Sequence, residues 1–277
     1  IIPPSVLVII IGTLANVSIA GMLIAGILPG LMLATMFLIY TLGRVRFNPS
    51  LAPEDAATST VDVSLGEKLR AILRVMPFAL IIFCVMGLIL LGIATPSESA
   101  ATGVVGSMIT AAYYRKLNWK MISESLSSAA FIASMILVIM ASSKMFSQLL
   151  AFTGSTRELT QVVAGLDLSA YLMLFIMMLI PFILCMFIDQ IALMLVVIPI
   201  YQPLIKSLEF DPIWFWLLML LNVTVGGMTP PFGYTIFAFK GATDRVSLQQ
   251  IFSATWPFVA IFLLGMLVIA AFPPIAT

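Results

Sequence analysis

Long apolar runs separated by short polar stretches make up most of this chain of 277 residues. The runs are continuous and do not alternate, which is typical of membrane-spanning helices and not of the strands of outer-membrane barrels. An all-α polytopic membrane protein is therefore predicted. Residues 1–14 are expected to be the second half of a crossing that begins upstream, and further crossings are expected at residues 27–42, 77–94, 97–114, 129–152 and 256–272.

The apolar run at residues 168–206 is interrupted near its middle by Asp189 and Gln190. Two full crossings would need about 40 residues and a turn, since each helix needs about 20. Two shorter helices that meet at Asp189 fit this length better. We therefore predict a re-entrant hairpin whose tip lies inside the membrane.

The apolar run at residues 213–239 contains the sequence GGMTPP. Prolines remove backbone donors and paired glycines weaken a helix, so two half-helices joined by an unwound segment are predicted. In hydrocarbon such a break persists only where protein, water or a ligand satisfies the backbone groups. Thr229 is expected to cap the second half-helix, with Pro230 at its first position. A proline kink satisfied by neighbouring helices, without a ligand, is the alternative.

The polar segments predict the connections between crossings. Residues 44–76 are expected to be a loop followed by an amphipathic helix in the interface, and 118–128 a second amphipathic helix. The sequence TPSE from Thr95 to Glu98 has the form of a capping box, which we favour over ligand contact. Residues 153–167 are predicted to be a loop.

The predicted domains are 1–43, the end of a first repeat; 44–76, a cytoplasmic loop and arm helix; 77–152, scaffold-type crossings; 168–241, the transport-domain hairpin and broken helix; and 242–277, an interfacial helix and the last crossing.

Lysine and arginine residues are distributed unequally between the two faces that this layout defines. Residues 44–76, 115–127 and 240–250 share one face and hold ten of them, whereas the other face holds only Arg157 and Lys206. Cytoplasmic loops carry an excess of these residues. The first face is therefore predicted to be cytoplasmic, with the hairpin entering from outside.

Composition excludes several classes of protein. Hydrophobic residues make up 62% of the chain and charged residues 9%, which is incompatible with a soluble domain. Histidine is absent, which removes serine–histidine and zinc proteases, and a two-aspartate protease would need a second carboxylate beside Asp189. No enzyme activity is expected, and no basic cluster indicates a nucleic-acid partner. Cys84 and Cys185 lie in apolar runs and are expected to be small core residues and not a disulfide. A purely structural subunit remains an alternative.

The beginning of the chain resembles its end. PPS at residues 3–5 is followed by VSI and Pro29, and PPF at 230–232 is followed by VSL and Pro257. Four crossings and the hairpin separate the two copies, so they are expected to point in opposite directions. Broken helices at matching positions of inverted repeats indicate the binding site of a transporter. Chance similarity within apolar sequence is the alternative.

Several motifs carry a resemblance to one family. IIPPS with VSIAGMLIAGILPG, GIATPSESAATG, MFIDQIALMLVVIPIYQP and DPIWFWLLMLLNVTVGGMTPPFG follow one another along nearly the whole chain. In this order they resemble the large membrane subunit of tripartite ATP-independent periplasmic (TRAP) transporters. The resemblance begins where that family's first repeat ends, so an N-terminal part is expected to be missing. Lys144 departs from the family, which usually has a small or polar residue there; a lysine snorkelling along its helix is weighed against a substrate contact.

The resemblance implies an elevator-type, sodium-coupled importer of an organic acid, such as a sugar acid or a C4-dicarboxylate, in the bacterial inner membrane. It also implies a small four-helix membrane subunit and a soluble periplasmic binding protein as partners. The runner-up is a stand-alone divalent-anion symporter of dicarboxylates or citrate, which needs no binding protein.

Asp189 is the main candidate for a cation ligand, because a carboxylate within the bilayer is costly and usually marks an ion path. The alternative role for Asp189 is a helix N-cap. Carbonyl, amide and hydroxyl oxygens near the GGMTPP break would complete a hard-oxygen site, and the resemblance selects Na⁺ over a proton. The remaining predicted cation ligands are Asn222, Thr224, Gly226, Gly227, Met228 and Thr229. The predicted substrate-binding residues are Pro4, Ser5, Pro230, Pro231 and Phe232.

Overall fold

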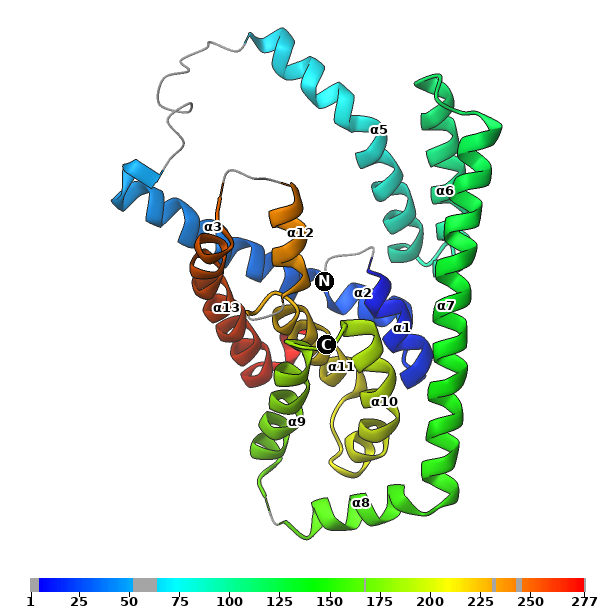
Figure 1. Cartoon of the computed structure of the whole chain (residues 1–277), viewed down its shortest axis with the longest axis vertical. Helices are drawn as coiled ribbons and strands as arrows, with labels where there is room; N and C mark the ends of the chain where they lie inside the picture. Colours follow the sequence, from blue (N-terminus) through cyan, green and yellow to red (C-terminus); the bar gives the residue numbers. More distant parts are fainter. Residues whose placement is uncertain (1–4, 52–63, 167, 231–232, 243–245, 277) are drawn as a thin grey trace. The chain divides into compact units, whose positions relative to one another are not determined.

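The described residues of the protein are helical and contain no strand. The computed structural model describes residues 5–51, 64–166, 168–230, 233–242 and 246–276. Figure 1 shows the helices in chain order. They are α1 (Val6–Ala15), α2 (Ile19–Ala25), α3 (Ile27–Phe47), the 3₁₀ turn η1 (Pro49–Leu51), α5 (Leu65–Leu90), α6 (Pro96–Tyr113), α7 (Trp119–Phe152), α8 (Ser155–Ala164), α9 (Ala170–Cys185), α10 (Gln190–Ser207), α11 (Pro212–Gly226), α12 (Tyr234–Ala242), α13 (Leu248–Ala271) and η2 (Pro273–Ile275).

Five helical segments of the described residues are long and apolar enough to cross a membrane. They are α2 with α3, then α5, α7, α10 and α13. Helices α1, α9 and α11 are apolar but shorter, and the predicted crossing at 97–114 forms α6, which is not among the five. The prediction of an all-α polytopic membrane protein is confirmed.

Three predicted pairs of an amphipathic helix and a crossing form single continuous helices, and the placement of their first parts in the interface stays a prediction. Helix α5 continues through Pro77, and α7 and α13 likewise begin in the expected interfacial segments and run on as single helices. The change from interface to hydrocarbon is a change of surroundings, which the backbone does not need to follow. A proline inside a membrane helix is tolerated where neighbouring groups satisfy the freed carbonyl.

The loop predicted at residues 153–167 is also wrong, because it contains helix α8. Gly154 precedes the helix with a φ of 75°, a conformation that glycine adopts without strain, and Gly165 ends it. The segment contains the charged residues Arg157 and Glu158. Such a composition occurs in loops, but it is also typical of short amphipathic helices.

The chain divides into two compact units, residues 1–33 with 132–277 and residues 34–131. Helix α11 is the core of the first unit: most of its side chains are buried, and α1, α2, α9, α10 and α13 pack against it. The Trp214 indole donates a hydrogen bond to the Ile269 carbonyl of α13 (3.0 Å). This satisfies the only polar group of a large buried ring.

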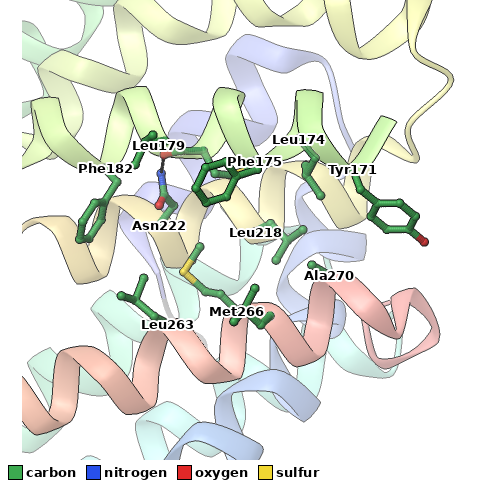
Figure 2. A pocket seen from close by; sticks show the side chains of 12 residues that line it. Tyr171, Leu174, Phe175, Leu179, Phe182, Leu218, Asn222, Leu263, Met266 and Ala270 are labelled. Carbon is green, nitrogen blue, oxygen red and sulfur yellow. Dashed lines mark hydrogen bonds between the residues drawn. The ribbon is translucent and has the colours of Figure 1, made fainter. Parts of the chain in front are cut away.

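An apolar cavity of about 430 Å³ lies between α9, α11 and α13 of this unit (Figure 2). Its lining is hydrocarbon, sulfur or aromatic ring apart from the Asn222 amide and the Tyr171 hydroxyl. The Asn222 amide nitrogen donates to the Met178 carbonyl (2.8 Å). With that amide bonded, the cavity suits hydrocarbon.

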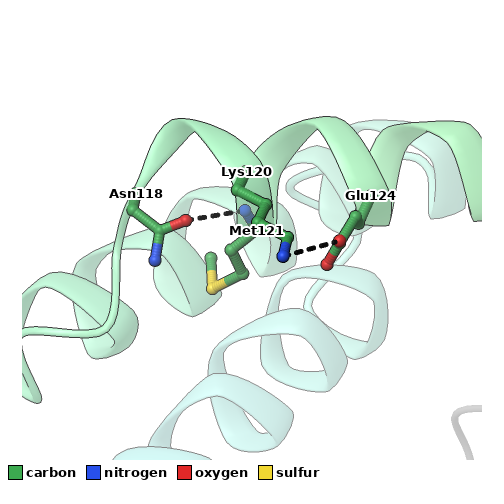
Figure 3. Close-up of polar contacts among 4 residues, drawn as sticks. All are labelled: Asn118, Lys120, Met121 and Glu124. Atoms are coloured by element: carbon green, nitrogen blue, oxygen red, sulfur yellow. Dashed lines mark hydrogen bonds and ion pairs between the residues drawn. The ribbon is translucent and has the colours of Figure 1, made fainter.

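The second unit is built on the packing of α5 against α6. Each helix begins with a capping box, at Ser64 with Glu67 and at the predicted Thr95 with Glu98, where the Thr95 N–H donates to the Glu98 carboxylate (2.8 Å). The prediction that Glu98 is a capping residue is therefore confirmed. At the start of α7 the Asn118 side chain accepts from the Met121 N–H (2.8 Å), next to an exposed Lys120–Glu124 ion pair (Figure 3).

Candidate functional site

Helices α9 and α10 form the predicted hairpin, joined by a turn at residues 186–189. Asp189 is the N-cap of α10: one carboxylate oxygen accepts from the N–H groups of Ile191 (2.9 Å) and Ala192 (3.2 Å). The carboxylate is exposed and its second oxygen makes no hydrogen bond to a described residue. Capping and ligand binding are therefore compatible roles, because capping uses only one of the two oxygens.

The predicted break in the helix at residues 213–239 is present. Helix α11 ends at Gly226 and α12 begins at Tyr234. In the last turn the N–H of Gly227 bonds to the Val223 carbonyl, whereas those of Met228 and Thr229 bond three residues back, to Val225 and Gly226. The helix thus tightens into a 3₁₀ turn before it unwinds.

The predicted role of Thr229 is wrong. Its buried hydroxyl donates to the Val225 carbonyl (2.6 Å), so it closes the end of α11 instead of capping the second half-helix. Pro230 lies in the linker, four residues before α12, and is not its first residue. A threonine hydroxyl can bond to the carbonyl four residues before it, and at Thr229 that carbonyl belongs to the last turn of α11 and not to α12.

Two backbone oxygens at the break accept no hydrogen bond from the described residues. The Thr224 carbonyl loses its usual partner because the Met228 N–H is shifted to Val225. The Gly227 carbonyl has Pro230 and Pro231 three and four residues ahead, and neither has an N–H. Within the part of the chain that the structure describes, neither oxygen accepts a hydrogen bond. Such carbonyls are suitable ligands for a small hard cation.

The hairpin turn is docked on this end of α11 (Figure 1). The Val223 carbonyl accepts from the Gln190 amide (2.9 Å) and from the Cys185 thiol (3.3 Å). A Cβ added at Gly226 would lie 2.7 Å from the Cys185 Cβ and 3.1 Å from the Phe182 carbonyl oxygen. Only glycine permits this approach, so the hairpin turn and the helix break lie side by side.

The predicted cation ligands are placed in two groups. Asn222, Thr224, Gly226, Gly227, Met228 and Thr229 are consecutive or nearly so along the end of α11, and Asp189 is on the turn that packs beside it. The Asn222 amide and the Thr224 hydroxyl donate within the protein, to Met178 and Leu220, and retain oxygens that can accept or coordinate. Cation binding by this set stays a prediction.

Among the predicted substrate residues, Ser5 is the N-cap of α1, where its hydroxyl oxygen accepts from the Val8 N–H (3.5 Å). Pro230 is half-buried in the linker after α11. Pro4, Pro231 and Phe232 lie outside the described residues. The predicted set is therefore placed only in part.

Two residues that hold the site together, Gln190 and Cys185, are not among the predicted site residues. Both side chains bond to the same carbonyl of α11, and both are buried. An uncharged amide directly after Asp189 in an apolar run was the available signal, because a buried amide requires a partner.

These features define a class: an α-helical membrane protein in which a helical hairpin is docked on an interrupted helix. Residues 1–275 match the family model described as the tripartite ATP-independent periplasmic transporter, DctM component. The chain belongs to this family, and the resemblance noted in its motifs is confirmed.

Relatives match over the full length of the chain. It is 28% identical to the ectoine/5-hydroxyectoine TRAP transporter large permease protein of Ruegeria pomeroyi and 31% identical to the ectoine TRAP transporter large permease protein of Halomonas elongata, covering 100% of this chain in both. The C4-dicarboxylate TRAP transporter large permease protein of Pseudomonas aeruginosa is 26% identical, again over 100% of the chain. The chain spans 63% of the length of each of these three proteins.

Proposed function

We propose that the protein is the membrane-embedded subunit of a sodium-coupled secondary transporter that imports an organic acid across the bacterial inner membrane. Its proposed partners are a small four-helix membrane subunit and a soluble periplasmic binding protein that delivers the substrate. Membership of the DctM component family supports this assignment.

The observation that carries the proposal is the docking of the hairpin turn on the interrupted helix. It brings the Asp189 turn to the segment where the Thr224 and Gly227 carbonyls have no donor among the described residues. A carboxylate with carbonyl oxygens is the ligand type that a small hard cation prefers, and a charge that replaces lost hydrogen bonds stabilises an unwound helix in hydrocarbon. Cation binding would thereby couple the hairpin to the break.

The relatives support a substrate class. The names of those described above specify ectoine and C4-dicarboxylates, and that of a further relative, a permease protein of Haemophilus influenzae that is 28% identical, specifies sialic acid. These compounds share a carboxylate and little else, so we propose that a carboxylate is the recognised group. Interrupted helices offer such a group the N–H-bearing ends of half-helices.

An inverted repeat and an elevator motion are part of the proposal. Ser18 and Ser247 occupy matching positions of the two similar sequence stretches, and each is the N-cap of the following helix, α2 or α13. The shared local structure supports the alignment of the two copies, in addition to their common residues.

Uptake by the assembled transporter in proteoliposomes tests the proposed function. With the binding protein outside, we expect uptake of a radiolabelled carboxylate that requires an inward sodium gradient. Removal of the binding protein should abolish it, since delivery is proposed to be obligatory. Sodium-independent uptake would contradict the coupling, and full uptake without the binding protein would favour a stand-alone symporter.

The proposed topology predicts which residues face the outside. Single cysteines at Glu158 in α8 and Glu209 after α10 should react with a membrane-impermeant maleimide in intact cells, and cysteines at Lys116 and Asn118 should not. All four positions are exposed, so accessibility on the protein does not differ. The native Cys84 and Cys185 lie within apolar helices. The reverse labelling pattern would overturn the orientation.

A further inference from the structure

A small polar cavity of about 110 Å³ lies between α1, α7 and α10, apart from the hairpin turn. A cavity of this size holds a few waters or one small anion. Most of its accessible lining is polar, in contrast to the apolar cavity of Figure 2. Its lining residues are Leu14, Asn16, Ser143, Lys144, Ser147, Ile198, Pro199 and Gln202.

Hydrogen bonds fix two walls of this cavity. Pro199 has no N–H for the Leu195 carbonyl one turn back, and the buried Ser143 hydroxyl of α7 donates to that carbonyl instead. On the other side the Gln202 amide donates to the Ala15 carbonyl at the end of α1 (2.9 Å). The cavity is therefore held by contacts between helices distant in the sequence.

Among the described residues, Lys144 is the only charged one in the cavity lining, and it forms no ion pair with any of them. It lies two helical turns, about 12 Å, before the end of α7 at Phe152. Side chains on a helix point back towards its N-terminus, so Lys144 would have to extend against this direction to reach the near interface. The Lys144 side chain is exposed, and an ammonium within a membrane-spanning helix usually faces water or is paired with an opposite charge.

The other polar groups of the lining can donate to such a counter-charge. Gln202 uses one of its two amide hydrogens for Ala15 and retains the second. The Ser147 hydroxyl and the Asn16 amide make no hydrogen bond to a described side chain or backbone group. No carboxylate lines the cavity.

A larger cavity of about 390 Å³ adjoins the first, because Asn16 and Gln202 line both. Its lining includes Lys206 and Asp211, at the end of α10 and the start of α11. The two cavities thus meet at Asn16 and Gln202, between the end of α10 and Lys144, and the accessible lining of the larger one is mostly apolar. Lys206 lines the larger cavity together with Asp211, which carries the opposite charge.

We propose that the cavity beside Lys144 binds a small monovalent anion, either a free inorganic ion or the carboxylate of a small acid, that enters past Lys206. Lys144 supplies the charge, and Ser147, Asn16 and Gln202 supply hydrogen-bond donors. This site is separate from the proposed cation site and does not depend on sodium coupling.

Binding of radiolabelled chloride and acetate to the purified transporter complex, at constant sodium with gluconate as the replacement anion, tests the proposal. We expect saturable binding by the wild type, with a raised melting temperature in chloride relative to gluconate. Lys144→Met should weaken binding at least about tenfold, since it removes a charge-assisted contact. Arg157→Met, at an exposed position of α8 outside both cavity linings, is the matched control and should leave the affinity unchanged, whereas Lys206→Met should slow association.

Lys144→Arg keeps the charge and should keep binding, and Lys144→Gln provides a second neutral variant should the methionine variant misfold. Competition by a transported carboxylate would identify its carboxylate as the occupant, and absence of competition would identify a free anion. Equal binding by wild type and both neutral variants, or no binding of chloride or acetate by the wild type, would overturn the proposal.

Discussion

Replacement of Asp189 by asparagine is expected to reduce transport sharply and to raise the sodium concentration for half-maximal uptake by about tenfold or more, which is about 1.4 kcal/mol of site affinity per factor of ten. The variant loses the negative charge beside the helix break. It retains a side-chain oxygen that can accept from Ile191 and Ala192, and asparagine is as good an N-cap as aspartate. Sodium-titrated uptake by the assembled transporter measures the shift.

Asp211→Asn is the matched control for this prediction. Asp211 caps α11 in the same way, accepting from the Trp214 N–H (2.8 Å), but it lies at the opposite end of that helix from the break. The control should melt and transport like the wild type. If Asp189→Asn also leaves both the rate and the sodium dependence unchanged, Asp189 is a cap alone and the proposed cation site is wrong.

Gly226→Ala is expected to have the second large effect, a loss of both stability and uptake. The new methyl group would lie 2.7 Å from the Cys185 Cβ, an atom fixed to the backbone that cannot rotate away. Helix α9 must then move off α11, which strains the bonds from Gln190 and Cys185 to the Val223 carbonyl. Overpacking of this kind costs about 1–3 kcal/mol. Thermal melting and uptake of the purified complex report the two effects.

Two further variants test the cause of this loss. Gly241→Ala adds a methyl group that meets no atom within 4 Å, so it should be neutral. Cys185→Gly combined with Gly226→Ala removes the clashing Cβ and should recover part of the lost stability, as a coupling in a double-mutant cycle. Wild-type melting and uptake of Gly226→Ala would show that close packing at this glycine is unimportant.

The helix break was predictable from the sequence because its cause is local. Pro230 and Pro231 lack N–H groups wherever the chain is placed, so α11 could not continue through them. The hairpin was predictable for a similar reason: Asp189 in a long apolar run marks a turn, and the run is too short for two full crossings. Covalent structure and segment length were sufficient in both cases.

The partners of the polar side chains were not predictable in this way. Thr229 was expected to cap the following helix, and the choice between the two directions depends on where the chain turns after Gly226. Gln190 bonds to a carbonyl 33 residues away, and Ser143 to one 52 residues away. Such pairs depend on how helices approach in space, which periodicity does not specify.

Gly226 and Gly227 show the difference between what the sequence predicts and what only the tertiary structure decides. In the sequence they are equivalent, since each weakens a helix for the same reason. In the structure Gly227 has a φ of −70°, which any residue adopts, whereas Gly226 faces the Cys185 Cβ. The sequence by itself determined that the helix must break here and that a hairpin with a carboxylate turn precedes it. Only the tertiary structure decided that the turn docks on the break and that the first glycine allows it, because the distance between two packed helices depends on side chains from both.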